Sequence, residues 1–318
     1  MDIDRWEAFD RAHPAPTFFA RPAFTRAFCD AFPHAEPWPV LVEHKGEEYI
    51  VPAIRSHARL GFKHAVAFPL GGYSCVLNER GEPAAEPYYS EVLKKASGAF
   101  DTFSFVGWPL AAQPNISGAS ATTHSTAVVD CSLGREHVLR GMRGVTRRMI
   151  GQSARRGVCC VQSPTDAVSV SRYYAMLEEA SARWGLTEPT ISRELLDAVI
   201  ARGGENVELW FAQLDGEAIA GGVILFGRDE LFFWSAAMRR DFSQYRPSNA
   251  LNARLLERAI ERDVRWYNLG ASEGLHGVER FKHDLGAHDV TYSALIVRSP
   301  GYRLYDSVRT ALHVGAAS

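Results

Sequence analysis

The chain has 318 residues, a length that suggests about two domains of roughly 150 residues each. With 46% hydrophobic and 23% charged residues, it can bury a sizeable core, and its formal net charge of −2 gives no reason to expect non-specific binding to nucleic acid. There is no apolar run of 18 residues, and the polar N-terminus does not resemble a secretory leader, so we expect a cytoplasmic protein without stable membrane insertion.

The first half of the chain mixes helix and strand signals. Phe24, Phe28 and Phe32 recur at a spacing of four residues, which is typical of one helical face. Alternating apolar residues around Lys45-Gly46 indicate a β-hairpin. The expected elements are a helix at 23–31, paired strands at 39–44 and 49–54, a strand at 65–68, a helix at 86–96, a strand at 102–106 and a loop at 107–123.

The segment 134–157 is expected to form one helix that is rich in arginine. Its apolar residues recur at helical spacing, and Gly157 would end it. On the other face, Arg143, Arg147 and Arg148 would lie together, so they are candidates for binding the phosphates of a nucleotide or tRNA, or an anionic acceptor. A solvated face or an ion-pair surface is the alternative interpretation.

The second half has the order of a mixed sheet flanked by helices. Asp215-Gly216 between two apolar runs is a strong hairpin signal, and Leu231–Gly270 has the pattern of a βαβ unit. The expected elements are helices at 168–184 and 194–201, strands at 207–214, 218–226 and 230–237, a loop at 245–249, a helix at 250–262, and strands at 264–269 and 293–297. The fold class is therefore α/β, with an α+β mixed sheet.

Two short segments carry candidate chemistry. The helix N-terminus after Arg246 presents unpaired N–H groups that suit a phosphate, although an ordinary capped helix would look the same. Lys282 beside Phe281 could hold an anionic ligand or stabilise an oxyanion, although a surface lysine beside a buried aromatic is the alternative.

The sequence has no Gly-x-Ser-x-Gly elbow, no His-Glu-x-x-His motif and no Walker loop. Its five cysteines lack CxxC spacing, so we expect neither a disulfide framework nor a metal site.

In this order, these segments resemble the FemAB-like superfamily of acyltransferases with the acetyltransferase-like GNAT fold. The resemblance extends over nearly the whole chain. The matching motifs are Phe68-Pro69 with Gly71-Gly72, Thr146–Ile150 with Arg155–Val158, Tyr173–Gly185, Asp215-Gly216 with Ile219–Gly222, Arg246–Leu251, Tyr267–Gly270, and Phe281-Lys282 with Leu285-Gly286.

The resemblance implies two tandem GNAT-like domains, here 1–155 and 156–318, with the arginine-rich connector helix at about 135–157 and the chain end packing on the first domain. Members form amide bonds from a thioester or from aminoacyl-tRNA. The Phe-Lys pair of the tRNA-using members maps onto Phe281 and Lys282 as the catalytic pair. By the same resemblance, the donor-binding residues are Trp234, Tyr245, Arg246, Ser248 and Asn249.

Two departures from the pattern bear on the donor. The run Tyr245–Ala250 has no glycine where enzymes that bind coenzyme A have a glycine-rich loop, and Asn268 stands where the family usually has Asp. Three hypotheses follow: aminoacyl transfer from aminoacyl-tRNA to an amine of a cell-wall precursor or metabolite, N-acylation from acyl-CoA, or a non-catalytic binding protein. In either enzymatic case the donor is a co-substrate, and no tightly bound cofactor is expected.

Overall fold

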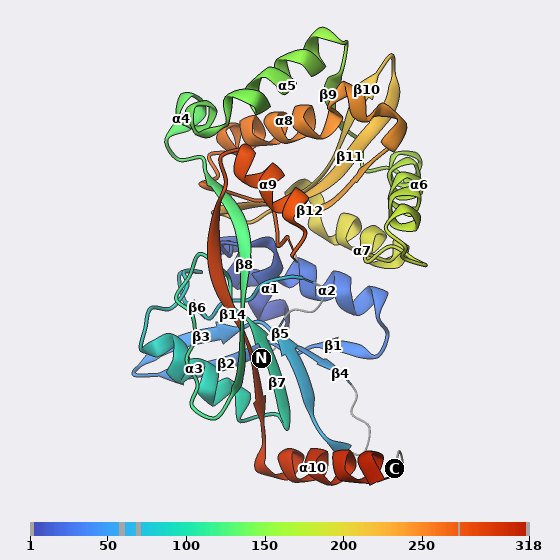
Figure 1. Ribbon diagram of the computed structural model, residues 1–318. Coiled ribbons are helices and arrows are strands. Elements are labelled where there is room, and N and C mark those ends of the chain that lie inside the picture. Colours follow the sequence, from blue (N-terminus) through green and yellow to red (C-terminus); the bar gives the residue numbers. More distant parts are fainter. Residues whose placement is uncertain (1–2, 57–60, 68–70, 273, 316–318) are drawn as a thin grey trace. The chain divides into compact units, whose positions relative to one another are not determined.

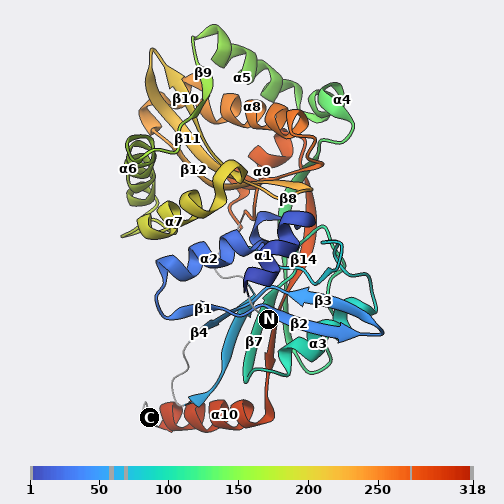
Figure 2. The same ribbon diagram turned by 180° about the vertical axis from the view of Figure 1, so that it is seen from behind.

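The computed structural model describes residues 3–56, 61–67, 71–272 and 274–315, and the chain forms two compact units (Figures 1 and 2). Unit 1 comprises Met1–Ala15, Phe19–His124 and Thr291–Ser318, and unit 2 comprises Pro16–Phe18 and Ser125–Val290. The chain passes from one unit to the other within β8 (Ser120–Asp130) and again within β14 (His288–Arg298). This contact-based division falls between His124 and Ser125 rather than at residue 155, so the arginine-rich segment belongs to unit 2.

The described residues of unit 1 form a mixed sheet, a small antiparallel sheet and four α-helices. In the mixed sheet the order is β1-β4-β5-β7-β14, with β5 and β7 parallel, and the small sheet has the order β2-β3-β6. The helices are α1 (Ile3–Ala12), α2 (Pro22–Ala31), α3 (Tyr88–Ser97) and α10 (Pro300–Gly315). The strands are β1 (Ala35–Pro37), β2 (Val40–His44), β3 (Glu47–Val51), β4 (Ile54–Ser56), β5 (His64–Ala67), β6 (Leu77–Asn78) and β7 (Thr102–Val106).

Most of the elements expected in the first half are confirmed, with two corrections. The expected strand 49–54 is divided into β3 and β4, because Pro52 has no N–H for a ladder. The expected loop 107–123 ends early, because β8 begins at Ser120. Helix α1 was not expected at all. Phe68 and Pro69, part of one family motif, lie outside the described residues.

Unit 2 has a six-stranded mixed sheet of order β8-β13-β12-β11-β10-β9. Only the pair β12 and β13 is parallel, and α8 connects the two strands, as the βαβ pattern predicted. The strands are β9 (Cys159–Ser163), β10 (Val207–Leu214), β11 (Glu217–Phe226), β12 (Glu230–Met238) and β13 (Trp266–Asn268). The helices are α4 (Gly134–Gly141), α5 (Gly144–Arg155), α6 (Ala167–Arg183), α7 (Arg193–Gly203), α8 (Pro247–Glu261) and α9 (His276–Asp284).

Helices cover both faces of the unit 2 sheet. Figure 1 shows α5 and α8 on one face and α6 and α7 on the other, which agrees with the packing of α8 on β10 and of α6 on β12. The buried residues Leu251, Leu255 and Ala259 form the apolar stripe of α8, as the helical spacing predicted. The α/β class, with a mixed sheet and helices in each unit, is therefore confirmed. No helix among the described residues is both long and apolar enough to cross a membrane.

The single helix expected at 134–157 is wrong in one respect, because the structure breaks it into α4 and α5. Met142 and Arg143 between them have extended backbone, with ψ angles of 142° and 144°. Gly141 and Gly144 flank the break, and glycine is a poor residue inside a helix. Gly286 approaches closely, since a β-carbon on it would lie 3.1 Å from the carbonyl carbon of Gly141. Met142 and Val138 are still buried, so the apolar pattern identified the correct face.

Candidate functional site

The parallel strands β12 and β13 diverge soon after they begin. They pair only from Glu230 and Trp266 to Phe232 and Asn268, whereas β12 continues along β11 as far as Met238. Beyond Phe232, the edge of β12 that faced β13 no longer has this ladder partner. Backbone N–H and C=O groups on such an edge can bind an extended ligand, and ligands of α/β sheets typically bind at the carboxyl ends of parallel strands.

A β-bulge lies on β12 at this point. The register with β11 shifts between Ser235, which faces Val223, and Phe233, which faces Ile224, so Trp234 is the extra residue. Bulges often occur beside functional sites because they redirect a side chain. Gly222 makes room for the neighbouring ring, since a β-carbon on it would lie 2.2 Å from Phe233. This glycine therefore gives an aromatic ring the space to pack against the strand.

The first turn of α8 follows a left-handed residue. Arg246 has φ +58° and is exposed, and its carbonyl accepts from the N–H groups of Asn249 and Ala250 at 3.1 and 3.2 Å. Pro247 has no N–H. Because Pro247 lacks an N–H and the Arg246 carbonyl accepts from those of Asn249 and Ala250, this helix end is less suited to a pyrophosphate than a glycine-rich loop would be.

Polar contacts tie this first turn to the strands beneath it. The Ser248 hydroxyl lies 3.3 Å from the sulfur of Met238 at the end of β12. The buried Asn252 donates to the Ser248 carbonyl at 2.9 Å and accepts from the Tyr267 hydroxyl of β13 at 2.8 Å. The start of α8 is therefore held at the point where β12 and β13 separate.

Lys282 lies on α9 and is almost entirely buried, with 5% of its surface exposed. Its ammonium group donates to the carbonyl oxygens of Gly270 and Ala271, each at 2.8 Å, just after β13 ends. The helix that carries it, His276–Asp284, was not among the elements expected from the sequence. Phe281 is half-buried and packs on the core of unit 2. The structure thus places a positive charge at the carboxyl end of β13.

A buried polar network fixes the end of β13. Asn268 accepts from the Thr126 hydroxyl at 2.7 Å and from the Gly270 N–H at 2.9 Å, and it donates to Glu230 at 2.8 Å. Asn268 and Glu230 are both fully buried. The sequence could not reveal this network because Thr126 is 142 residues away from Asn268. The departure from the family's usual Asp was the only signal at this position.

The three candidate arginines have different surroundings. Arg143, at the start of α5, donates to the carboxylate of Asp284 at 3.0 Å. Arg147 donates to the carbonyls of Leu139 and Met142 and so closes the end of α4. Arg148 is exposed on the same helix. Of the three, Arg148 is the side chain that the structure presents most openly to an anion.

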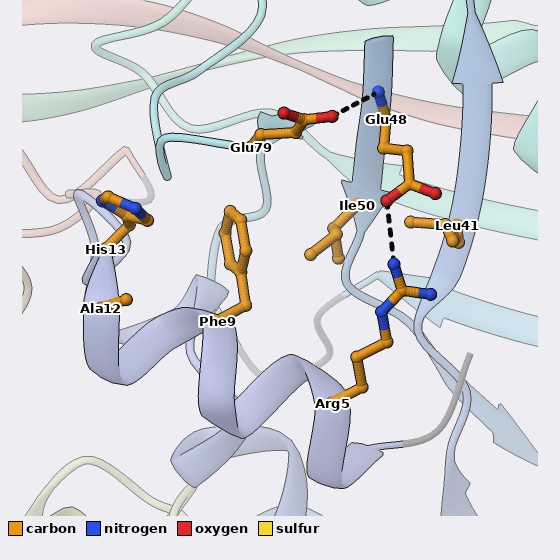
Figure 3. Close-up of a pocket in the computed structure, with 8 residues that line it drawn as sticks. All are labelled: Arg5, Phe9, Ala12, His13, Leu41, Glu48, Ile50 and Glu79. Carbon is orange, nitrogen blue, oxygen red and sulfur yellow. Dashed lines mark hydrogen bonds and ion pairs between the residues drawn. The ribbon is translucent and has the colours of Figure 1, made fainter.

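Unit 1 has a pocket that none of the predicted site residues lines (Figure 3). It has a volume of about 460 Å³ and lies between α1 and strands β2 and β3. Arg5 pairs with Glu48 across it at 3.0 Å, and Glu79 accepts from the Glu48 backbone N–H at 3.4 Å. Phe9 and Ile50 provide apolar walls. The mixture of charges predicts no single ligand for this pocket.

Four of the five predicted donor-binding residues, Tyr245, Arg246, Ser248 and Asn249, lie just before or in the first turn of α8, whereas Trp234 lies at the bulge of β12, four residues before that strand ends. Lys282 contacts the chain just after the end of β13. The hydrogen bond from Arg143 to Asp284 connects the start of α5 to α9, the helix that also carries Lys282. The roles of all these residues stay predictions.

Comparison with known proteins supports a transferase fold. Residues 140–283 match the family model described as an acetyltransferase (GNAT) domain. These residues include the diverging strands, α8 and Lys282. No curated protein matches the chain in sequence.

Solved structures resemble the chain over almost its whole length. FemX has a TM-score of 0.70 at 10% identity and covers 96% of this chain and 98% of its own. The C-terminal domain of a putative lysylphosphatidylglycerol synthetase from Agrobacterium fabrum has a TM-score of 0.57 at 12% identity, with 98% and 96% covered. The L-PGS structure from Bacillus licheniformis has a TM-score of 0.54 at 13% identity, with 99% and 97% covered. The resemblance to the FemAB-like GNAT fold is therefore confirmed as a likeness of fold.

Proposed function

We propose that this chain, which has the FemAB-like tandem GNAT fold, transfers an aminoacyl group from aminoacyl-tRNA to the amine of a cell-wall precursor or a small metabolite. The observation that carries this proposal is the geometry at the end of β12 and β13. A buried lysine lies at the strand end, and at the neighbouring helix start Pro247 has no N–H and the Arg246 carbonyl accepts from the N–H groups of Asn249 and Ala250. The likeness to FemX and to the lysylphosphatidylglycerol synthetases supports the same activity.

The chemistry needs few groups from the protein. An aminoacyl ester is already activated, so the acceptor amine attacks the carbonyl carbon, a C–N bond forms and the C–O bond to the ribose breaks. The ribose oxygen leaves with a proton. The enzyme mainly orients the two substrates and stabilises the negative charge on the carbonyl oxygen.

The charge of Lys282 is suited to that second task. Charges interact more strongly in a buried, low-dielectric site than in water. The carbonyls of Gly270 and Ala271 hold the ammonium group in place, so it needs no reorganisation as the oxyanion forms. We assign to Trp234, Tyr245, Arg246, Ser248 and Asn249 the binding of the donor end, and to Arg143, Arg147 and Arg148 the binding of an anionic part of a substrate.

The second candidate is N-acylation from acyl-CoA, and the match of residues 140–283 to a GNAT acetyltransferase domain favours it. The thioester would lie along the same free edge of β12. Against it stands the first turn of α8, where Pro247 and the Arg246 carbonyl reduce the N–H groups available to a pyrophosphate.

One pair of experiments separates the two donors. The purified chain is first titrated by calorimetry with acetyl-CoA and with free coenzyme A. It is then offered a pool of charged tRNAs and a set of amine acceptors, and loss of the aminoacyl group is measured. We expect no CoA binding and acceptor-dependent deacylation. Saturable micromolar binding of acetyl-CoA without tRNA deacylation would establish the second candidate in place of the first.

A further inference from the structure

Helix α9 and the start of β14 bring three potential metal ligands together. Glu279 and His283 are four residues apart on α9 and so share one face of the helix, and Asp289 is the second residue of β14. The three ligand atoms, one from each side chain, all lie within 4.8 Å of one another, and His283 Nε2 lies 2.9 Å from Asp289 Oδ2. All three residues belong to unit 2.

The turn between helix and strand fixes this arrangement. The backbone N–H of Gly286 donates to His283, and that of Ala287 donates to Lys282, which closes α9 tightly. Gly286 has φ +92°, so the chain reverses within a few residues and Asp289 returns beside His283. The cluster is therefore built by regular structure and does not depend on a long loop.

We propose that Glu279, His283 and Asp289 bind a divalent transition-metal ion, with Zn²⁺ the best match to their chemistry. One imidazole nitrogen and two carboxylates are ligands that Zn²⁺ accepts, at bond lengths of about 2.0–2.2 Å. Such bonds place ligand atoms roughly 3–3.5 Å apart. His283 and Asp289, at 2.9 Å, are within a few tenths of an ångström of this spacing, and a rotation of the partly exposed Glu279 side chain closes the remainder.

The charges of the cluster formed by Glu279, His283 and Asp289 favour the binding of a cation over a simple surface ion pair. Within the three-residue cluster one imidazole accompanies two carboxylates, and the imidazole of His276 adjoins Glu279 from outside the cluster. A divalent ion neutralises both carboxylates. His276 lies one turn before Glu279, with its Nδ1 3.5 Å from the Glu279 carboxylate, and its 96% exposed side chain is free to swing as a fourth ligand.

A bound ion would join α9 to β14. His283 follows Lys282 directly in α9, so the ion would also restrain the helix that carries the buried lysine. Metal binding needs no tRNA or acyl donor, and its test is therefore independent of the proposed transferase activity.

The test is titration of the full chain, freed of metal by a chelator, with Zn²⁺ in competition with a chromophoric chelator. We expect one equivalent bound with micromolar affinity and a higher melting temperature. His283→Ala and Asp289→Asn should each weaken binding by more than the roughly 10–100-fold that loss of an outer-shell partner costs. The matched control is His288→Ala, an exposed histidine next to Asp289 that is outside the cluster, and it should bind as the parent does.

Other results would overturn the site. If no single equivalent of Zn²⁺ binds, or if His283→Ala and His288→Ala weaken it equally, then the histidines bind the ion adventitiously. Tighter binding of Ca²⁺ than of Zn²⁺ would contradict the role of the imidazole. Circular dichroism of each variant establishes that it is folded before its affinity is compared.

Discussion

The ammonium group of Lys282 donates to the carbonyl oxygen of Gly270 at 2.8 Å, and the N–H of the same glycine donates to Asn268. Gly270 is thus held from both sides, by α9 and by the end of β13. The position of the lysine charge depends on a backbone segment that a buried asparagine fixes. This relationship connects the candidate catalytic residue to the polar network behind it.

Replacing Lys282 tests its electrostatic role. We expect Lys282→Met, which keeps the aliphatic volume, to lower the rate of aminoacyl transfer by about 10²–10³ because one preorganised contact to the oxyanion is lost. The measurement is single-turnover transfer from charged tRNA. Loss of the donor to the part-buried carbonyls of Gly270 and Ala271 should also cost about 1 kcal/mol of stability. Rates are therefore measured well below the melting temperature of the variant, and an undiminished rate in the folded variant would contradict the role.

Asn268→Asp, which restores the family's usual residue, should destabilise this chain. The new carboxylate would face Glu230 in a fully buried site where Asn268 now donates at 2.8 Å. We expect a loss of about 3–5 kcal/mol at pH 7, since an uncompensated charge would be buried. Two carboxylates in contact raise the pKa of one of them, so the loss should shrink as the pH falls toward 5. Urea unfolding at both pH values measures it.

The double variant Asn268→Asp with Glu230→Gln is the matched control. In this variant an amide at position 230 can donate to a carboxylate at position 268, which is the reverse of the present hydrogen bond. The double variant should therefore recover most of the lost stability. If the double variant is no more stable than Asn268→Asp alone, the contact with Glu230 is not the cause of the loss.

The sequence predicted most of the strands, and α6, α7 and α8, because their apolar periodicity and turn residues are local signals, but it did not predict β1, β6 or β8. It missed the break between α4 and α5 because Gly141 is packed against Gly286, which is distant in sequence. It also missed α9, since seven of its nine residues are polar, charged or glycine and its apolar side chains are few. The same distinction between local and tertiary signals applies to the candidate site. Lys282 was predicted from a motif, whereas its carbonyl acceptors and the hydrogen bond from Thr126 to Asn268 depend on tertiary contacts.

Gly286→Ala should destabilise unit 2 more than Gly274→Ala does. Both glycines have positive φ, at 92° and 77°, so both substitutions carry a conformational cost of about 1–2 kcal/mol. Only at position 286 would the new β-carbon also press on backbone, 3.1 Å from Gly141, whereas at 274 it meets nothing within 4 Å. Thermal unfolding of the two variants compares them, and equal losses would show that the close approach is unimportant.

Arg148 should contribute to binding of tRNA through its charge. Because it is exposed on α5, we expect Arg148→Gln to weaken binding and to reduce the slope of log K against log salt by about 0.7–0.9. The matched control is Arg172→Gln, an exposed arginine on α6, which covers the opposite face of the sheet. Filter binding at salt concentrations between about 50 and 200 mM gives the affinity and the salt slope of each variant. Identical slopes for the two variants would remove α5 from the tRNA-binding surface.

Asp101 should make the stability of unit 1 depend on pH. Its carboxylate accepts from the Lys63 backbone N–H at 2.9 Å and from the Ser299 hydroxyl at 3.0 Å, next to the start of α10. The hydrogen bond from Lys63 lowers the pKa of Asp101 below its usual value of 3.8. A carboxyl group whose pKa is lower in the folded than in the unfolded state stabilises the fold at pH values above its unfolded pKa. This contribution is lost as the pH falls through the folded pKa.

We therefore expect Asp101→Asn to be less stable than the parent at pH 7, by about 1 kcal/mol or less because solvent screens the site. The difference should be constant from pH 7 to about 5 and should shrink as the pH falls further, because the parent carboxylate then becomes protonated. Urea unfolding at pH 7, 5 and 4 measures this. A difference that grows toward acid pH would mean that the charged form of Asp101 is not the form that the fold stabilises.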